Sequence, residues 1–471
     1  MRPVVVGAGL ALLLGCTGMA AAPASVVASG SRFHGEPASA PFAPCADSSS
    51  DPSLASSRCA VAELPLDPAG GGEGSVEMFV RRFDAADPGT RRGQVWLVAG
   101  GPGEPGASLY PFIPLFRRAF PGHDLLVPDH RGTGDSTRLC PEQEAADSAG
   151  GYGLADAEWG PCIGALYADP ARTRAFNITN AAHDLSALIG RFHEPGEVHV
   201  YGVSYGTQLV LRMMQVAPPG LDGLVLDGLV PPESESQWDL GHRTRIVDAV
   251  GRATLTPVQG ERYAQLLAMA PATWQTVLPG GDLRQFMGML LNFPAFRARI
   301  PALVDSLLEG RTDLLEKTIE DLRQEHARLT PYPQSRPSLP LVMLISASEN
   351  NARRDLSAEM VAQEAKEALF TSPIPGFLAN TSLPLYERDR YFGRTPAQLP
   401  RTLVIHGTLD PNTPYSGARA HAQALASVGG LHFTTITDGA HMLPLVAPGC
   451  FVSVVSAHMA RAVMPGYCTE P

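Results

Sequence analysis

The pattern of apolar and polar positions divides the chain into segments of two kinds. Short runs rich in β-branched and aromatic residues predict strands at 78–83, 94–98, 124–128, 197–203, 221–227, 402–406 and 432–437. Elsewhere apolar residues recur at intervals of three and four, as in 179–192, which predicts amphipathic helices. Strands that alternate with helices in this way favour a mostly parallel sheet with helices on both faces.

The middle of the chain follows a different pattern, without alternating strands. From 231 to 398 the apolar residues follow a helical periodicity that prolines interrupt. The periodicity is clearest at 282–292, 301–308 and 313–329. We interpret this region as a helical cap inserted into an α/β core. The core then comprises 59–230 and 399–471, and 471 residues are enough for a core with an added domain.

The first residues have the pattern of an export signal. Within 1–28, Arg2 is followed by an apolar run and then by small residues, and the run is too short for a stable membrane anchor. The sequence ending at Cys16 resembles a bacterial lipobox, which would make Cys16 a lipidated first residue. Ala22-Pro23-Ala24 offers an ordinary cleavage site instead. We expect an exported protein (periplasmic, cell-envelope or secreted) with a Ser/Ala/Pro-rich segment at 29–58 and no transmembrane segment.

The cysteines also favour an oxidising compartment. Besides Cys16 there are six, an even number that falls into three pairs local in sequence. Six cysteines allow fifteen connectivities, among which we predict Cys45–Cys59, Cys140–Cys162 and Cys450–Cys468. No Cys-x-x-Cys or His-x-x-x-His spacing accompanies them, so we expect no metal site. A net charge of −11 and the lack of a basic run argue against nucleic acid as a partner.

The strongest chemical signal is the sequence Gly202-Val203-Ser204-Tyr205-Gly206 between a predicted strand and a predicted helix. This layout is typical of a nucleophile elbow, which exposes a serine hydroxyl on a sharp turn. The N–H of Tyr205, at the start of the helix, would stabilise an oxyanion. An earlier Gly-rich loop after the strand 94–98 would supply a second N–H donor from Gly101. The alternative interpretations are an ordinary Gly-rich turn and a surface loop.

Two further residues complete a candidate triad. Asp410 follows the strand 402–406, and His441 follows the strand 432–437, so each is expected at a strand end. Asp410 is the expected acid and His441 the expected base. Asp438 is an alternative acid, although its closeness to His441 favours a role in the loop.

Three motifs together resemble a known family of enzymes. They are Ala99-Gly-Gly-Pro-Gly103, Asp129-x-Arg-Gly-x-Gly-x-Ser136 and Gly202-x-Ser-Tyr-Gly-Thr207. They are similar to signatures of α/β-hydrolase serine peptidases of family S33, the prolyl iminopeptidase and tripeptidyl-aminopeptidase group. The positions of the cysteines are similar to those of the secreted branch with a tripeptidyl-aminopeptidase-like C-terminal region. The sequence departs from that branch at Val203, where Glu is common, and at Glu104-Pro105, where small residues are usual.

The resemblance implies an α/β-hydrolase fold in which Ser204, Asp410 and His441 occur in the usual chain order. It implies an enzyme that releases residues or short peptides from substrates with free N-termini and needs no cofactor. A carboxylesterase with the same triad is the alternative. A non-catalytic binding protein on this fold should have lost a triad residue, and all three are present here.

An aminopeptidase must also bind a protonated amine, and a buried cation needs a carboxylate partner. Glu349 matches by position a Glu-containing segment in the cap of the family, so it is the first candidate. Glu233 and Glu235 lie where the chain leaves the core for the cap and are the second candidates.

Overall fold

A computed structural model describes residues 41–48, 51–68, 70–269, 273–278 and 280–470. The export signal expected at 1–28, with Cys16, and the first part of the segment expected at 29–58 lie outside these residues. Among the helices that the structure describes, none is both long and apolar enough to cross a lipid bilayer.

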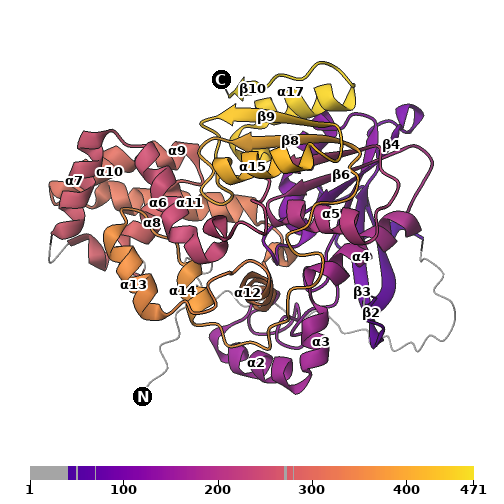
Figure 1. Ribbon diagram of the computed structural model, residues 1–471, viewed down its shortest axis with the longest axis horizontal. Coiled ribbons are helices and arrows are strands. Elements are labelled where there is room, and N and C mark those ends of the chain that lie inside the picture. Colours follow the sequence, from indigo (N-terminus) through magenta and orange to yellow (C-terminus); the bar gives the residue numbers. More distant parts are fainter. Residues whose placement is uncertain (1–40, 49–50, 69, 270–272, 279, 471) are drawn as a thin grey trace.

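A ten-stranded sheet forms the centre of the molecule (Figure 1). Seven neighbouring strands, β5, β4, β6, β7, β8, β9 and β10, run parallel to one another. The other three, β1, β2 and β3, form an antiparallel edge, and β3 is antiparallel to β5. All seven strands predicted from the sequence belong to this sheet. In spatial order the strands are β1 (Ala43–Pro44), β2 (Ser57–Asp67), β3 (Gly72–Phe83), β5 (His123–Pro128), β4 (Gly93–Val98), β6 (Glu197–Val203), β7 (Gly223–Asp227), β8 (Arg401–Gly407), β9 (Leu431–Thr437) and β10 (Tyr467–Thr469).

The register of the parallel strands brings their carboxyl ends to one edge of the sheet. Val98 at the end of β4 lies opposite Gly202 near the end of β6, and Val203 lies opposite Asp227 of β7. On the next pair, Gly407 of β8 lies opposite Ile436 of β9. The loops that follow these strands therefore meet, which is where open α/β sheets bind their ligands.

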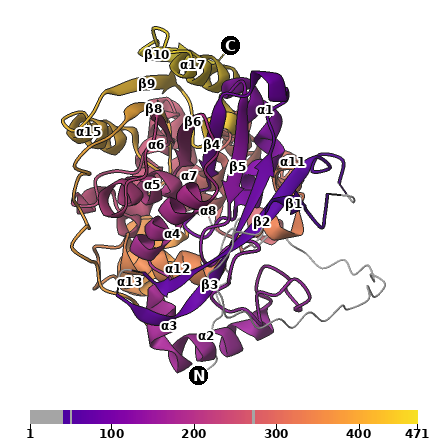
Figure 2. The same ribbon diagram turned by 90° about the vertical axis from the view of Figure 1, so that its right-hand side faces the viewer.

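Helices cover both faces of the sheet, as predicted (Figure 2). On β4, Trp96 and Val98 pack into the hydrophobic core on one face, whereas Val95 and Leu97 pack into the core on the other. Successive side chains of a strand point to opposite faces, so a sheet covered twice needs strands that are apolar throughout. One face carries α4 (Ile178–Arg191), α5 (Tyr205–Val216) and α15 (Tyr415–Leu425); the other carries α1 (Ile113–Ala119), α16 (Leu443–Val446) and α17 (Pro448–Met459).

The chain between β7 and β8 is helical, as the pattern of 231–398 predicts. In Figure 1 its first helices form a lobe beside the sheet, and they have a hydrophobic core of their own. The helices of this insertion are α6 (Arg243–Ala253), α7 (Pro257–Ala268), α8 (Leu283–Leu290), α9 (Pro294–Arg297), α10 (Ile300–Leu308), α11 (Asp313–Leu329), α12 (Leu339–Ser348), α13 (Ala358–Glu367) and α14 (Ile374–Ala379).

Helix α12 connects the insertion to the sheet. Its side chains Leu341, Leu344 and Ile345 pack into the core beneath α4 and α5 rather than into the core of the lobe. Pro340 lies in the first turn of α12, where a helix tolerates proline because the missing N–H would have no partner there. Pro257, Pro294 and Pro301 likewise lie in the first turns of α7, α9 and α10.

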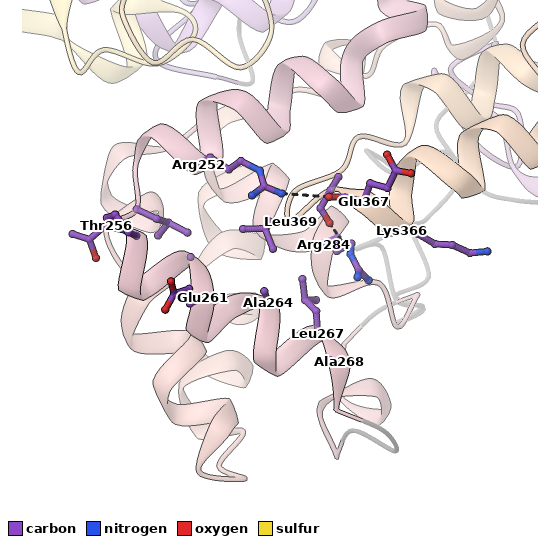
Figure 3. A pocket seen from close by; sticks show the side chains of 14 residues that line it. Arg252, Thr256, Glu261, Ala264, Leu267, Ala268, Arg284, Lys366, Glu367 and Leu369 are labelled. Carbon is purple, nitrogen blue, oxygen red and sulfur yellow. Dashed lines mark hydrogen bonds between the residues drawn. The ribbon is translucent and has the colours of Figure 1, made fainter.

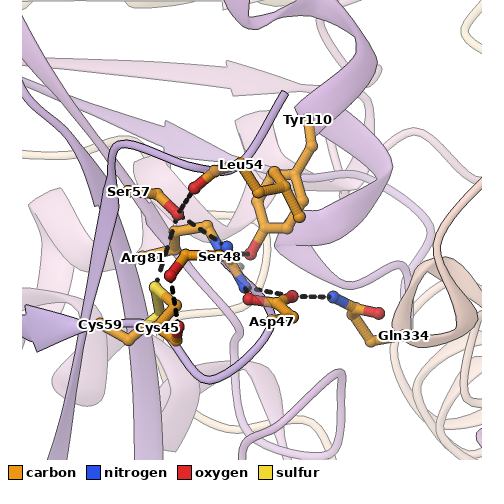
Figure 4. Close-up of a disulfide and its surroundings, with 9 residues drawn as sticks. All are labelled: Cys45, Asp47, Ser48, Leu54, Ser57, Cys59, Arg81, Tyr110 and Gln334. Carbon is orange, nitrogen blue, oxygen red and sulfur yellow. Dashed lines mark hydrogen bonds and ion pairs between the residues drawn. A yellow bond between two sulfur atoms is a disulfide. The ribbon is translucent and has the colours of Figure 1, made fainter. Parts of the chain in front are cut away.

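Three disulfides join segments that are close in sequence: Cys45–Cys59, Cys140–Cys162 and Cys450–Cys468. The first follows β1 and lies beside the buried Arg81, whose guanidinium donates hydrogen bonds to Asp47 (2.7 Å) and Ser57 (2.8 Å) (Figure 4). The second joins the loop after β5 to α2 (Trp159–Ala168), which precedes α3 (Pro170–Ala175), and the third joins α17 to β10. The disulfides thus secure the two edges of the sheet and the connection into α2.

The motif after β5 serves as scaffold. Arg131 is buried and binds both carboxylate oxygens of Asp184 on α4 (2.6 and 2.7 Å). Its other nitrogens donate to backbone carbonyls, including that of Ala175 (2.8 Å). The carboxylate of Asp129 accepts the N–H groups of Gly106 (2.7 Å) and Asp135 (2.8 Å). These charge-assisted hydrogen bonds hold neighbouring loops together.

Candidate active site

Ser204 lies on a sharp turn between β6 and α5. Its backbone has φ 56° and ψ −126°, a conformation that costs a residue with a side chain about 1–3 kcal/mol. The turn is fixed by two hydrogen bonds: the N–H of Ser204 donates to the carbonyl of Asp227 (2.9 Å), and the N–H of Thr207 donates to the carbonyl of Ser204 (2.8 Å). The serine side chain is thereby presented at the carboxyl edge of the sheet.

The glycines of the turn are required by close backbone contacts. A Cβ atom on Gly206 would lie 2.6 Å from the carbonyl oxygens of both Val98 and Ala99, and one on Gly202 would lie 2.8 Å from the carbonyl oxygen of Gly206. A side chain cannot be accommodated against backbone at such distances. The turn that carries Ser204 is therefore packed directly against the end of β4.

His441 and Asp410 form a hydrogen bond of 2.7 Å between the imidazole Nδ1 and a carboxylate oxygen. Asp410 is buried and accepts three further hydrogen bonds, from the N–H of Asn412 (2.8 Å), the N–H of Thr413 (2.9 Å) and the hydroxyl of Thr413 (2.8 Å). These bonds orient the carboxylate toward the imidazole. Because Nδ1 is hydrogen-bonded to Asp410, Nε2 is the ring nitrogen available for proton transfer.

The pair also sets the protonation of its members. Burial alone lowers the pKa of His441, but the charge of Asp410 and their hydrogen bond outweigh it, so the pKa of His441 is raised. Burial raises the pKa of Asp410, and the charge of His441 and the hydrogen bonds more than offset this, leaving that pKa well below its usual range. The site therefore stabilises an imidazolium beside a carboxylate.

Ser204 and His441 both adjoin the end of β7, at Asp227 and Gly228. The carbonyl of Asp227 accepts the N–H of Ser204, and a Cβ on Gly228 would lie 3.0 Å from Cε1 of His441. Three strand ends, those of β6, β8 and β9, thus bring the predicted nucleophile, acid and base to the same place. Asp438, the alternative acid, is exposed and forms no ion pair with a described residue.

A second buried acid, Asp227, lies beside the candidate triad, and no motif in the sequence marks it. Asp227 accepts hydrogen bonds from the hydroxyl of Tyr201 (2.8 Å) and from the N–H of Leu443 (3.1 Å). Burial raises the pKa of Asp227 to about 7, although these hydrogen bonds and the charge of His441 oppose the rise. Its position at the end of a predicted strand was the available signal.

The two expected oxyanion donors come from the start of α5 and from the loop after β4. Tyr205 is the first residue of α5, and Gly101 has a φ of 111°, where a Cβ would lie 2.6 Å from the N of Gly103. Within the described residues, neither the N–H of Tyr205 nor that of Gly101 donates to an acceptor of the protein. Both N–H groups are consequently free to bind an oxygen of a ligand.

Two of the three acidic residues expected to bind an amine contact Arg212 of α5. Arg212, which is buried, donates to Glu349 (2.8 Å) and to Glu233 (3.0 Å). Burial raises the pKa of Glu349 to about 7, although Arg212 opposes the rise. Glu235 is exposed. The structure therefore gives Glu349 and Glu233 a cationic partner within the protein.

Cavities occur away from Ser204. One of about 660 Å³ lies among α6, α7, α8 and α13, with Arg252, Arg284 and Lys366 among its lining residues, and none of the predicted site residues lines it (Figure 3). A smaller one of about 90 Å³ borders Glu233 and Arg212.

One group of side chains in the described ranges has donor atoms close enough together to hold a metal ion. It consists of His123, Glu197 and His199, at the amino ends of β5 and β6. Ser204 lies at the opposite end of β6, so this group is separate from the candidate triad. Its residues come from two strands, so no local spacing in the sequence reveals the group.

Comparison with known proteins gives one family. A family model described as "alpha/beta hydrolase fold" matches residues 95–448. None of the curated proteins matches the sequence.

Among solved structures, similar chains include a thermophilic esterase from Thermogutta terrifontis (15% identity, 85% of this chain and 98% of that chain, TM-score 0.39). A hydrolase from Pseudomonas aeruginosa has 17% identity over 85% of this chain and 98% of its own, with a TM-score of 0.39. An evolved variant of a potato epoxide hydrolase has 15% identity over 85% and 99%, with a TM-score of 0.38.

Proposed function

The chain belongs to the α/β-hydrolase fold family, and from this premise we propose that it is an exported serine aminopeptidase that removes residues or short peptides from free N-termini. The observation that carries the proposal is the 2.7 Å hydrogen bond between His441 and Asp410 at the edge of the sheet where Ser204 occupies its strained turn. The three disulfides are compatible with export.

In this mechanism the Oγ of Ser204 attacks the carbonyl carbon of a peptide bond while Nε2 of His441 accepts the hydroxyl proton. The imidazolium then donates that proton to the leaving amine, and the acyl group remains on Ser204. A water molecule, deprotonated by His441, hydrolyses the ester and regenerates the enzyme. Asp410 holds the imidazole in the tautomer that leaves Nε2 unprotonated and stabilises the charged form.

The negative charge that develops on the carbonyl oxygen needs donors already in place. We assign this role to the N–H groups of Tyr205 and Gly101, which have no acceptor among the described residues. Such a donor typically contributes about 3 kcal/mol of transition-state stabilisation. Neither a metal ion nor an organic cofactor enters these steps.

The proposal has a direct test with substrates. The purified protein and its Ser204→Ala variant are assayed with fluorogenic aminoacyl amides, tripeptidyl amides and short-chain esters. We expect the wild type to cleave at least one class of free-amine amide and the variant to cleave none. Hydrolysis of esters alone would favour the carboxylesterase, which shares the triad. Equal activity of the variant would exclude Ser204 as the nucleophile.

A further inference from the structure

Glu104 brings a carboxylate to the nucleophile, from the loop that carries Gly101. A Cβ on Gly100 would lie 3.1 Å from Cβ of Ser204 and 3.4 Å from Oε2 of Glu104. Ser204 and the carboxylate therefore border the same small space. Burial raises the pKa of Glu104, and the charge of His441 opposes that rise. His441 is therefore near enough to act on this carboxylate.

The carboxylate of Glu104 has no hydrogen-bond or ion-pair partner within the part of the chain that the structure describes. The other acidic groups near the site are satisfied: Asp410 by His441, Asp227 by Tyr201, and both Glu349 and Glu233 by Arg212. The charge of His441 does not fully offset the cost of burying this carboxylate, and a cationic ligand would reduce the cost that remains.

The backbone around Glu104 is held from two directions. The carbonyl of Gly103 accepts the N–H of Ser338, just before α12 (2.9 Å), and the N–H of Gly106 donates to Asp129 (2.7 Å). The insertion and the loop after β5 thus fix the position of the side chain before any substrate arrives. Such preorganisation is what a binding group needs to contribute to affinity.

We propose that Glu104 binds a cationic group on the residue whose carbonyl Ser204 attacks, foremost the α-ammonium group of a substrate's N-terminal residue. This rests on the proposed function for the nucleophile. The α-nitrogen of an amino acid is only two bonds from its carbonyl carbon, so a carboxylate that borders Ser204 is in reach of it. In a tripeptidyl substrate the terminal amine would lie about 7 Å farther away. The position of Glu104 therefore favours release of one residue at a time.

A side-chain ammonium at the same residue has the same chemistry, so the test must separate the two sources. Four amides of one fluorophore do so: leucyl, N-acetyl-leucyl, N-acetyl-lysyl and alanyl-alanyl-leucyl. The enzymes are wild type, Glu104→Gln, Glu349→Gln, and Glu73→Gln as a matched control, because Glu73 is an exposed carboxylate with no predicted role in the site. Thermal unfolding of each variant establishes that it is folded.

On the wild type, kcat/KM should be highest for the leucyl amide. Glu104→Gln should lower that value about 30-fold or more, as expected for a buried charge pair broken on one side. The N-acetyl-leucyl value should stay the same, and Glu73→Gln should change neither value. A selective loss on N-acetyl-lysyl amide would support Glu104 as the cation site with the side chain as its source.

Three results would overturn the proposal: equal cleavage of all four amides by the wild type, an equal loss on all four in Glu104→Gln, or a selective loss in Glu349→Gln but not in Glu104→Gln. The wild-type comparison needs no variant, so it holds even if Glu104→Gln does not fold. Failure of the proposed function is seen separately, as activity retained by Ser204→Ala.

Discussion

At the scale of single residues, the chemistry depends on how Asp410 controls His441. The imidazole is surrounded by protein, which by itself would favour its neutral form, yet the adjacent carboxylate raises its pKa. A general base works only when neutral, so activity should fall as pH drops through that pKa. In the wild type the acidic limb of kcat/KM should therefore lie above the ordinary histidine value of about 6.5.

Replacing Asp410 by Asn should lower kcat by several orders of magnitude, because the amide favours the wrong imidazole tautomer. The residual activity should show an acidic limb at lower pH, since burial, which lowers the pKa of His441, is no longer outweighed by the carboxylate. Steady-state rates from pH 4 to 9 measure both effects. Asp438→Asn is the matched control and should behave like the wild type. The acid would be misassigned if Asp438→Asn lost activity and Asp410→Asn kept it.

At the scale of elements, the turn between β6 and α5 limits which residues the chain accepts. In Gly206→Ala the new methyl group would lie 2.6 Å from two backbone carbonyl oxygens of the segment after β4. Such overpacking costs about 1–3 kcal/mol or more, because backbone cannot rotate away as a side chain can. Chemical denaturation should show this loss in the free energy of unfolding.

Gly190→Ala provides the control for that comparison. Gly190 lies within α4, and a Cβ there would meet no atom within 4 Å. Alanine is the better helix former by about 1 kcal/mol, so this variant should be as stable as the wild type or more so. If both variants had the same stability, the contact between the turn and β4 would not limit the choice of residue.

Arg212 links α5 of the core to the insertion, where Glu349 ends α12, and to Glu233 after β7. Arg212→Met would leave two carboxylates with little solvent and no cation, which typically costs about 3–5 kcal/mol. Arg252→Met is the control, because Arg252 pairs with Asp248 on the exposed face of α6 and such pairs contribute about 1 kcal/mol or less. Equal unfolding free energies for the two variants would mean that the buried cluster does not stabilise the junction.

At the scale of the whole molecule, the α/β core could be predicted because its signals are local. Apolar strands, a Gly-x-Ser-x-Gly turn and an acid and a histidine after later strands can be recognised one at a time. Three strands at or next to the edges of the sheet were missed: β1 is two residues long and β10 three, and β2 has an irregular register between Pro65 and Asp67. Edge strands bury one side at most, so their sequences lack the continuous apolar run of the central strands.

The parts that sequence could not supply are those that depend on distant contacts. Nothing in the local sequence of Arg212 shows that it binds Glu233 and Glu349. Glu233 follows β7 in the chain, and Glu349 lies at the end of α12. The same holds for Glu104, which in sequence is a departure from a motif and becomes a neighbour of Ser204 only in the fold. Charge pairing between distant segments has no periodicity from which to predict it.

The most direct test of the central claim is covalent labelling of the full-length protein by a fluorophosphonate probe, followed by peptide mass spectrometry. A serine activated as proposed should take up one phosphonyl group, on the peptide that contains Ser204. Ser204→Ala, folded by the criterion of thermal unfolding, should take up none, and Asp410→Asn should react far more slowly. Labelling of a different residue, or labelling of Ser204→Ala at the wild-type rate, would contradict a serine mechanism at this site.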